Sequence, residues 1–318
     1  MADPSYEILP FDALKGWAAD DHRAALDVFC TTADLITDPY WQAVCHLAPT
    51  STNPRGFFEL YFHPVLITDG EPALFTGYYE PELRGARVAD ATYRYPVHAL
   101  PADLPKGLTR RAIDEGALSH DHVLVWLADP VDAFFLHVQG SGRVLFVDGS
   151  AIRLGFAGKN GLPYTSVGQA LVARGVVDKD QVSADFIRDW VRQNPTAGRD
   201  LLWINESYVF FRELTQLADD AGPLGAMKRS VTPGRSLAID PAFTPLGAPV
   251  WIEKQGVDAL HRLMVAQDTG SAIKGAQRAD IYFGTGDAAG RTAGRVRDSG
   301  RMVVLMPITV SRQLAGLV

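Results

Sequence analysis

Short runs of aromatic and β-branched residues, divided by glycine and proline, recur through most of this chain and limit the folds it can adopt. After Gly56 they read FFELYFHPVLI, ALFTGYYEP, RYPVHAL, HVLVWLADP, AFFLHVQGSG and RVLFVDGS, and after Ser230 SLAID, APVWIE, LMVAQD, ADIYFG and RMVVLMP. Each run has the composition of a β-strand, and Gly140-Ser141-Gly142 predicts a hairpin between two of them. No long helical pattern divides the C-terminal runs, which disfavours βαβ units. We therefore predict a mainly β fold with minor α content.

Three segments show the apolar spacing of helices instead. In AADDHRAALDVFCTTADLI the apolar positions include Ala25 and Phe29 and follow the helical repeat. PYWQAVCHLA predicts a second helix with Pro39 in its first turn. DKDQVSADFIRDWVRQNP predicts a third, with Ser183 as its N-cap.

Composition places the chain among soluble globular proteins with room for more than one core. It has 318 residues, 47% hydrophobic and 21% charged, which is enough for two domains. The net charge of −7 and the lack of a basic stripe disfavour nucleic-acid binding. No apolar run reaches the roughly 18 residues of a membrane span. The linkers LADDAGPLG and VTPGRS predict a domain boundary near residue 219.

The N-terminus and the cysteines leave the cellular compartment open. MADPSYEILPFDALKGW has neither the basic nor the apolar region of an export signal, so either the protein is cytoplasmic or a signal has been removed. Composition slightly favours Cys30 and Cys45 as free buried thiols, while one disulfide suits an oxidising compartment. The histidines are scattered without CxxC or HExxH spacing, and we expect no metal and no cofactor.

The segment MVAQDTGSAIKGAQRADIYFGTGDAAGRTAG holds the residues most suited to acid–base chemistry. Asp268 follows an apolar run and Asp280 precedes another, so both carboxyls are expected to be poorly solvated, which raises a carboxyl pKa. A raised pKa is what a general acid near neutral pH requires. The alternative, about equally supported by spacing alone, is that both aspartates cap turns. Asp287 is expected in a solvated turn, and Lys274 to be solvated or paired with an aspartate.

Neutral polar side chains cluster upstream of these aspartates. FTGYYEP sets Thr76, Tyr78 and Tyr79 around a glycine, where stacking on a sugar or a base competes with a strand end holding core tyrosines. VQGSGRV, FAGKNGLPYTSVG and WINESYVFFRE add further uncharged donors and acceptors, namely Gln139, Ser141, Asn160, Tyr164, Ser166 and Asn205. Such groups suit a carbohydrate groove better than a phosphate site, although KNG is also an ordinary turn signal.

Two other functional motifs are excluded or discounted. QGSGR lacks the spacing of a nucleophile elbow, so no serine-hydrolase role is assigned. GTGDAAG matches half of a dinucleotide fingerprint but is expected to lack the following helix and the ribose-binding acid.

Taken in order, FTGYYEP, VQGSG, AGKNGLPYTSVG, NESYVFF, PGRSLAID and AQDTGSAIKGAQRADIYFGTG resemble the membrane-bound lytic murein transglycosylase A family (MltA) over about residues 55–310. The resemblance implies a double-psi β-barrel made of residues 1–80 and 219–318, with a smaller β-rich domain, residues 81–218, inserted and a substrate groove between them. The C-terminal part resembles a 3D domain, named for three aspartates. These match Asp240, Asp268 and Asp280.

The resemblance also implies a reaction. Family members cleave the β-1,4 bond between N-acetylmuramic acid and N-acetylglucosamine in peptidoglycan without water and leave a 1,6-anhydromuramoyl end. The catalytic acid matches Asp280, with Asp268 and Thr76 as supporting residues. We expect the glycan strand to be bound by Tyr78, Tyr79, Gln139, Ser141, Asn160, Tyr164, Ser166, Asn205 and Asp240.

The resemblance further implies a periplasmic protein, outer-membrane-associated in its full-length form, although no signal or lipid-attachment cysteine stands at this N-terminus. A periplasmic location would favour a Cys30–Cys45 disulfide. Peptidoglycan strands are the expected partner, and other cell-wall enzymes are further candidates.

Three alternatives stay open at the level of sequence. One is a hydrolytic muramidase, in which Asp268 or Asp240 activates water. Another is a noncatalytic peptidoglycan-binding module. An aspartic protease is remote, because only Asp268-Thr269-Gly270 fits the required motif and its partner carboxylate is missing.

Overall fold

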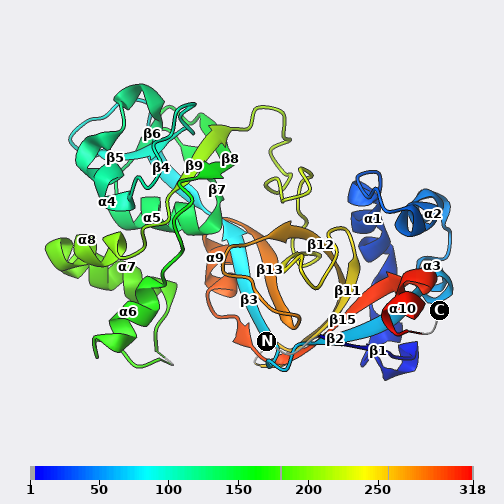
Figure 1. Cartoon of the computed structure of the whole chain (residues 1–318). Helices are drawn as coiled ribbons and strands as arrows, with labels where there is room; N and C mark the ends of the chain where they lie inside the picture. The colour runs from blue at the N-terminus through cyan, green and yellow to red at the C-terminus, as the bar shows by residue number, and fades with distance from the viewer. Residues whose placement is uncertain (1–3, 180, 257, 317–318) are drawn as a thin grey trace. The chain divides into compact units, whose positions relative to one another are not determined.

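The computed structural model describes residues 4–179, 181–256 and 258–316, and it is mainly β with some helices (Figure 1). The chain divides into two compact units. Unit 1 contains Met1–Tyr78, Ala221–Gly284 and Arg295–Val318, and unit 2 contains Tyr79–Asp220 and Thr285–Gly294. Each unit has its own sheet and its own hydrophobic clusters.

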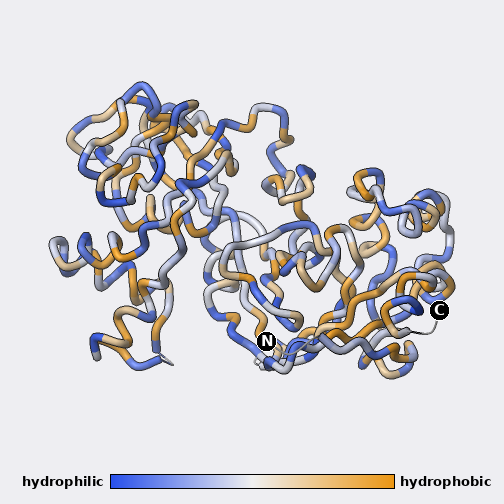
Figure 2. Tube along the Cα trace, in the orientation of Figure 1, coloured by the Kyte–Doolittle hydropathy of each residue, from blue (hydrophilic) through white to orange (hydrophobic). Residues whose placement is uncertain are grey.

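A nine-stranded sheet forms the frame of unit 1, in the order β1-β2-β15-β11-β12-β10-β13-β3-β14. Its strands are β1 (Ser5–Ile8), β2 (Phe62–Thr68), β3 (Leu74–Glu80), β10 (Ser236–Ile239), β11 (Pro249–Lys254), β12 (Leu260–Thr269), β13 (Arg278–Thr285), β14 (Arg297–Asp298) and β15 (Gly300–Pro307). The last residues of β3 and β13 lie beyond the boundary, in unit 2. All five strands predicted after Ser230 are present. β15 is almost wholly buried and largely orange in Figure 2, as a central strand should be.

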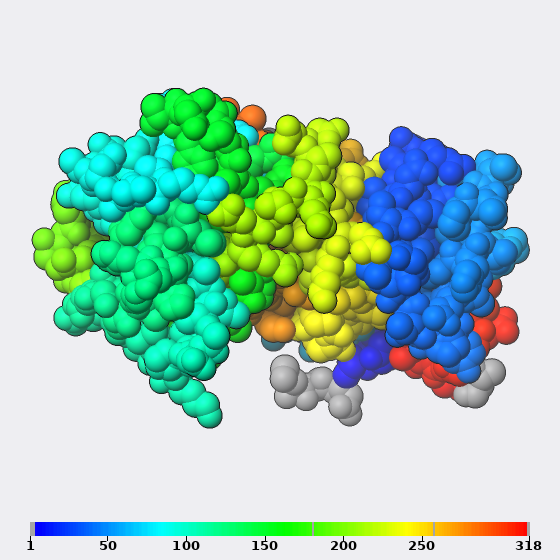
Figure 3. All heavy atoms as spheres, turned by 90° about the horizontal axis from the view of Figure 1, so that it is seen from above, coloured from blue at the N-terminus to red at the C-terminus, as the bar shows by residue number. Residues whose placement is uncertain are grey.

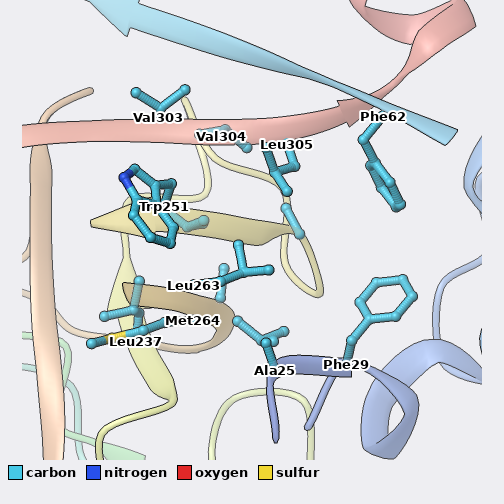
Figure 4. Close-up of a cluster of buried hydrophobic side chains, with 14 of the residues drawn as sticks. Ala25, Phe29, Phe62, Leu237, Trp251, Leu263, Met264, Val303, Val304 and Leu305 are labelled. Atoms are coloured by element: carbon cyan, nitrogen blue, oxygen red, sulfur yellow. The ribbon is translucent and has the colours of Figure 1, made fainter. Parts of the chain in front are cut away.

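Helices at both ends of the chain complete unit 1. They are α1 (His22–Ala33), α2 (Pro39–Leu47), α3 (Pro54–Tyr61) and α10 (Ile308–Leu314), with single 3-10 turns at Phe11–Ala13, Trp17–Ala19 and Ala48–Thr50. The N-terminal helices, blue in Figure 3, lie beside the yellow segment that contains β11. Figure 4 shows Phe29 of α1 near Phe62 of β2, in the same core as Trp251 of β11. Burial of these large side chains is the main stabilising contribution to unit 1.

The ends of these helices follow from local sequence. The Asp21 side chain accepts a hydrogen bond from Ala24 N–H and caps α1, and Asp38 caps α2 ahead of Pro39. Both helices were predicted. The strand predicted over FFELYFHPVLI was wrong in its first half, because Asn53 and Pro54 start α3 there and the strand begins only at Phe62. The aromatic residues of α3 pack into the core at helical spacing, which a count of β-formers does not detect.

Unit 2 has a six-stranded sheet in the order β5-β6-β4-β7-β8-β9. Its strands are β4 (Glu82–Ala86), β5 (Tyr95–His98), β6 (Val123–Leu127), β7 (Ser141–Leu145), β8 (Ala151–Lys159) and β9 (Val209–Glu213). Its helices are α4 (Arg110–Ala112), α5 (Pro130–Gln139), α6 (Val167–Ala173), α7 (Ala184–Gln193), α8 (Pro195–Trp203) and α9 (Gly286–Ala293), with a π turn at Ile113–Ala117 and a 3-10 turn at His120–His122. The predicted third helix is α7, and Ser183 caps it.

Three predictions in this unit were wrong. AFFLHVQGSG is not a strand but most of α5, which Asp129 caps and Pro130 begins. Gly140 ends α5 in the left-handed conformation, φ 77°, and β7 begins at Ser141, so residues 140–142 lead from a helix into a strand and form no hairpin. The helix that was expected to be missing from GTGDAAG is present: α9 begins at Gly286, and Asp287, exposed as predicted, lies in its first turn.

α9 is grouped with unit 2, whereas the domain bounds drawn from the sequence left it with the C-terminal part. Two contacts explain the grouping. Thr285 donates a hydrogen bond to Glu80 at 2.9 Å. Gly290 lies so close to the ring of Tyr79 that an added Cβ would stand 2.7 Å from a ring carbon.

The sheet edges, the helix lengths and the two cysteines each bear on an expectation drawn from the sequence. Among the residues that the structure describes, each sheet ends in two edge strands, so neither sheet closes into a barrel. Within the described ranges no helix has the length and apolar character needed to cross a bilayer. Cys30 and Cys45 are free, and burial raises the pKa of Cys45 to about 11, which makes it a poor nucleophile.

Candidate active site

Four neighbouring strands of unit 1, β12, β10, β13 and β3, bring the predicted acidic residues together. Ala238 of β10 pairs with Asp280 of β13 on one side and with Asp268 of β12 on the other. Directly paired residues project to the same face of a sheet, so both carboxyls stand on the face that carries the Ala238 methyl group. Two strand spacings separate their backbones, roughly 10 Å. The small, buried side chain of Ala238 lies between them.

A β-bulge sets this arrangement. Between Leu237 and Ala238 the β10–β12 register shifts, so that Gln267 is the extra residue and Asp268 becomes the partner of Ala238. The Gln267 side chain is buried, where it accepts from the Ser236 hydroxyl at 2.6 Å and donates to Val28 O in α1 at 3.1 Å. Bulges commonly re-aim a side chain beside a functional site. Here the bulge places the Gln267 side chain in the core and the Asp268 side chain on the face that carries Asp280.

Asp280 is held by a threonine from the neighbouring strand. The Thr76 hydroxyl donates to Asp280 Oδ1 at 2.6 Å. Burial raises the pKa of Asp280, and the effect outweighs the Thr76 hydrogen bond and the Arg278 charge, which both act to lower it. The apolar surroundings inferred from the sequence therefore have the expected effect.

Asp268 has more partners and is perturbed as well. Its Oδ1 accepts from Ala226 N–H at 2.9 Å and Thr269 N–H at 2.8 Å, and its Oδ2 accepts from Tyr78 OH at 3.0 Å. Burial nevertheless raises the pKa of Asp268 to about 6, and the charge of Asp280 contributes in the same direction. The side chain is thus fixed in orientation by three donors.

Tyr78 connects Asp268 to an apolar cluster. Its ring lies 5.2 Å from that of Tyr282, and both tyrosines are buried with Val231, Ala238 and Ile273. Burial raises the pKa of the Tyr78 hydroxyl well above its ordinary value, so this group stays a hydrogen-bond donor to Asp268. Its position fits the core tyrosine considered as an alternative to an exposed stacking residue.

Asp240 anchors a loop. Its carboxylate accepts from Gly275 N–H at 3.0 Å and from Ala242 N–H at 3.2 Å, and Lys274 pairs with it at 3.3 Å. Burial acts to raise the pKa of Asp240, but these hydrogen bonds and the Lys274 charge lower it overall. An ionised Asp240 therefore holds residues 274 and 275, which precede β13. The pairing of Lys274 with an aspartate is one of the two outcomes expected for it.

The remaining predicted site residues belong to unit 2. Gln139, at the end of α5, accepts from Tyr79 N–H at 3.1 Å, and the Tyr79 hydroxyl accepts from Arg188 at 3.1 Å. Ser141 is buried at the start of β7. Ser166 caps α6 by accepting from Gln169 N–H. Tyr164 is 39% exposed, in the loop before α6.

Asn160 and Asn205 are buried and support that loop. Asn160 donates to Leu108 O and Glu206 O, both at 2.8 Å, and accepts from Leu162 N–H and Tyr208 N–H. These bonds use both donors and both lone-pair directions of its amide. Asn205 accepts from Thr165 N–H at 3.1 Å. Together the two amides hold residues 161–165, the segment that presents Tyr164.

Two residues with a place in these networks were missed from the sequence. Arg278 donates to Thr76 Oγ1 at 2.8 Å, and Glu80 is a fully buried glutamate between Arg143 and Arg153. Period-2 spacing signals Arg278, since it lies two residues before Asp280 on the same strand. For Glu80 there was no local signal, because its partners are distant in sequence.

The described residues also bear on two other kinds of site, a metal site and a surface hollow elsewhere in the protein. Within the part of the chain that the structure describes, no group of three or more His, Cys, Asp or Glu side chains is arranged to hold a metal ion. A surface hollow of about 570 Å³ lies in unit 2, lined by Gly85–Arg87, Phe146–Asp148 and Ser150–Ile152, and none of the predicted site residues lines it. The Asp280–Thr76 pair, by contrast, holds a carboxyl whose pKa is raised by burial and whose Oδ1 is fixed by a hydroxyl donor.

Comparison with known proteins identifies the family. Residues 74–212 match the MltA specific insert domain, and residues 235–306 match the 3D domain. The chain is 35% identical over 241 residues to the membrane-bound lytic murein transglycosylase A of Vibrio cholerae. The match covers 72% of this chain and 64% of that relative, so the chain spans less than two thirds of the relative's length.

Solved structures agree with the sequence comparison. A membrane-bound lytic murein transglycosylase from Agrobacterium tumefaciens superposes with a TM-score of 0.88 and 32% identity, over 98% of this chain and 99% of that one. Escherichia coli MltA with bound chitohexaose gives a TM-score of 0.79 and 28% identity, over 95% and 94% of the two chains. The resemblance drawn from the sequence motifs is confirmed. The chain belongs to the membrane-bound lytic murein transglycosylase A family.

Proposed function

We propose that this protein is a lytic transglycosylase that cleaves the β-1,4 bond between N-acetylmuramic acid and N-acetylglucosamine in peptidoglycan and leaves a 1,6-anhydromuramoyl end. Family membership supports the reaction class, and the relative solved with chitohexaose supports a glycan ligand. The observation that carries the proposal is the Thr76–Asp280 hydrogen bond, which holds a carboxyl of raised pKa opposite Ala238 of β10.

In the proposed mechanism one carboxyl serves as both acid and base. Protonated Asp280 donates its proton to the glycosidic oxygen while the bond from that oxygen to the muramoyl C1 breaks. The ionised Asp280 then takes the proton from the muramoyl O6 hydroxyl as O6 bonds to C1. The substrate supplies its own nucleophile, which gives a large proximity advantage. The asymmetry of the two carboxyls supports this assignment, because Asp268 already accepts three hydrogen bonds and is suited to hold the site's geometry.

The other predicted site residues divide by their surroundings. We propose Tyr79, Gln139 and Tyr164 as direct glycan contacts, since each is only partly buried. Ser141, Ser166, Asn160, Asn205, Tyr78 and Asp240 are proposed to act through the segments they hold. We retain the double-psi topology for the residues 1–80 and 219–318, the inserted domain over 81–218, and a periplasmic, outer-membrane-associated location as proposals that rest on the family.

Product analysis with an Asp280 variant tests the proposal. Mass spectrometry of muropeptides released from purified sacculi should show 1,6-anhydro ends from the unaltered protein. Asp280→Asn should reduce this release at least about a thousandfold, within the range removed with a general acid and a base. Asp287→Asn is the matched control, because it makes the same change at an exposed aspartate, and it should release anhydro products normally.

The same experiment separates the alternatives. Reducing ends in place of anhydro ends would mean hydrolysis by a muramidase. Binding to sacculi without any soluble product would mean a noncatalytic module. Full turnover by Asp280→Asn would move the acid to another group, and Asp268→Asn would then be the next variant to measure.

A further inference from the structure

Three side chains of unit 1 form a hydrogen-bonded chain that ends on Asp280. Arg278 Nη2 donates to Thr76 Oγ1 at 2.8 Å, and Thr76 Oγ1 donates to Asp280 Oδ1 at 2.6 Å. Arg278 and Asp280 are two residues apart on β13 and therefore project from the same face. Thr76 lies on β3, the neighbouring strand, and reaches both of them.

The direction of this chain follows from what each group can donate. A guanidinium has only donors, while a hydroxyl has one proton and two lone pairs. Arg278 therefore takes one Thr76 lone pair, and the single Thr76 proton is directed to Asp280 Oδ1. If the Asp280 proton sat on Oδ1, Thr76 would have to accept twice, and its own proton would lose the acceptor recorded for it. No second acceptor for that hydroxyl is recorded among the described residues, and leaving a buried donor unpaired costs about 1–3 kcal/mol.

Arg278 is held in place for this contact. Its Nη1 donates to Ala279 O at 2.6 Å and to Leu74 O at 3.3 Å. No carboxylate lies within 4.0 Å of its guanidinium in the described part of the chain, in contrast to Arg235, which pairs with Asp20. Among the described residues its one side-chain hydrogen-bond partner is Thr76, so the guanidinium acts on Asp280 through that hydroxyl and through space.

We propose that Arg278 is a positioning residue that, through Thr76, fixes the catalytic proton of Asp280 on Oδ2. This inference rests on the proposed function, because it assigns the oxygen from which Asp280 donates. Oδ2 then carries the proton toward the glycosidic oxygen and receives the proton from O6, while Oδ1 stays bound to Thr76 throughout. The acid keeps one geometry in both steps, which is what a carboxyl used first as acid and then as base requires.

Kinetics of matched arginine variants provide the first test. Arg278→Gln should lower kcat on the order of tenfold and change KM little. This loss is a part of the rate enhancement that a correctly positioned general acid supplies. Arg278→Lys, which keeps a donor and the charge, should restore part of that loss. Arg262→Gln is the control: it removes another half-buried strand arginine of unit 1 and should leave kcat unchanged. Equal kcat values for the unaltered protein and Arg278→Gln would overturn the proposal.

A double variant tests whether the two side chains act together. Thr76→Val should lose about as much kcat as Arg278→Gln, and the double variant should lose no more than Thr76→Val alone, because both break the same chain of hydrogen bonds. Fully multiplicative losses would contradict a shared path. Near-ultraviolet circular dichroism of each variant checks that the fold is intact.

A substrate-free titration separates this inference from the proposed function. The ¹³C carboxyl signal of Asp280, assigned by its loss in Asp280→Asn, reports protonation without any glycan. Charged or titratable groups around Asp280 are Arg278 on its own strand, Tyr78 on β3, Asp268 on β12 and Arg297 on β14, which pairs with Thr76. Arg278 lowers the pKa of Asp280, so Arg278→Gln should move its titration to higher pH and Arg278→Lys should not.

Each outcome of that titration has one meaning. An unmoved signal in Arg278→Gln would overturn the assignment even if the protein releases anhydro products. A shifted signal in a protein that releases no such product would support the Arg278–Thr76–Asp280 chain and reject the proposed function.

Discussion

Two aspartates of similar burial have different surroundings, and their surroundings separate their roles. Asp280 accepts one hydrogen bond, from Thr76, whereas Asp268 accepts three, from Tyr78, Ala226 and Thr269. A carboxyl fixed by several donors is well suited to orient a site, while one held at a single oxygen keeps the other free for proton transfer. Burial raises the pKa of both, that of Asp268 to about 6, so the assignment of Asp280 as the acid rests on its hydrogen bonds and not on its pKa.

The raised pKa of Asp268 predicts a specific dependence of stability on pH. Its folded-state pKa, about 6, lies above its ordinary 3.8, so the unfolded state releases the proton first as pH rises. The contribution of Asp268 to stability is therefore present below about pH 4 and lost by about pH 6. Asp268→Asn has no such proton to lose. We therefore compare the free energy of unfolding of Asp268→Asn with that of the unaltered protein. The variant's value minus that of the unaltered protein should increase by roughly 1–3 kcal/mol between pH 4 and pH 7.5.

Urea unfolding at the two pH values measures this difference. Asp287→Asn, at an exposed position, serves as the control and should show no comparable change. The contrary result is that Asp268→Asn and the unaltered protein differ in free energy of unfolding by the same amount at both pH values. That result would mean that Asp268 titrates normally in the folded state.

At the scale of elements, the site depends on how strands and loops are held relative to one another within each unit. The bulge at Gln267 turns Asp268 toward the face that carries Asp280, and Asp240 fixes the loop before β13. In unit 2, Asn160 and Asn205 hold residues 161–165. Buried amides with every hydrogen bond made specify one backbone path, because any other path leaves polar groups unpaired.

Two substitutions in unit 2 distinguish a residue that supports the loop 161–165 from a residue proposed to contact the glycan. Asn160→Ala removes four hydrogen bonds from a buried site, and it should lower the free energy of unfolding by about 2–4 kcal/mol. Tyr164→Ala, at a side chain 39% exposed, should change stability little and weaken binding to chitohexaose several-fold. Thermal unfolding and calorimetric titration measure the two effects. Equal stability of both variants would contradict this division.

At the scale of the whole molecule, a buried ion cluster lies where the chain enters and leaves unit 2. Glu80 follows directly after the boundary at Tyr78–Tyr79 and pairs with Arg143 at 3.1 Å and Arg153 at 3.0 Å. The same arginines donate to the carbonyls of Asp219 and Ala218, just before the chain returns to unit 1. Thr285, the next residue to enter unit 2, donates to Glu80. Glu80 and its two arginines therefore connect the three places where the chain enters unit 2, leaves it and enters it again.

Removing that carboxylate should destabilise unit 2 selectively. Glu80→Gln leaves two arginines without their counter-charge, and breaking a buried pair in this way costs about 3–5 kcal/mol. Because unit 1 has its own core, we expect calorimetry to resolve two transitions, of which Glu80→Gln lowers only one. Asp20→Asn, which breaks the Arg235–Asp20 pair of unit 1, should lower the other. If both variants shift the same transition, the two units unfold together.

Local patterns in the sequence determined several parts of this protein. The strands after Ser230, the capped helices α1, α2 and α7, and the poorly solvated setting of Asp280 all follow from residues that are neighbours in the chain. The family followed from the order of short motifs, and the matches to the insert and 3D domains confirm it. These features depend on apolar periodicity, caps and turn residues, which act over a few positions.

Tertiary structure decided the rest. AFFLHVQ has the composition of a strand but folds as α5, because its apolar side chains fill two clusters of unit 2 at once. The bulge that sets the direction of Asp268, the partners of Glu80 and the link from Arg278 to Asp280 join residues 2 to more than 200 positions apart. Such contacts depend on register and on which groups lose water together. Short-range sequence patterns do not determine strand register or burial, because both are set only when distant strands pair.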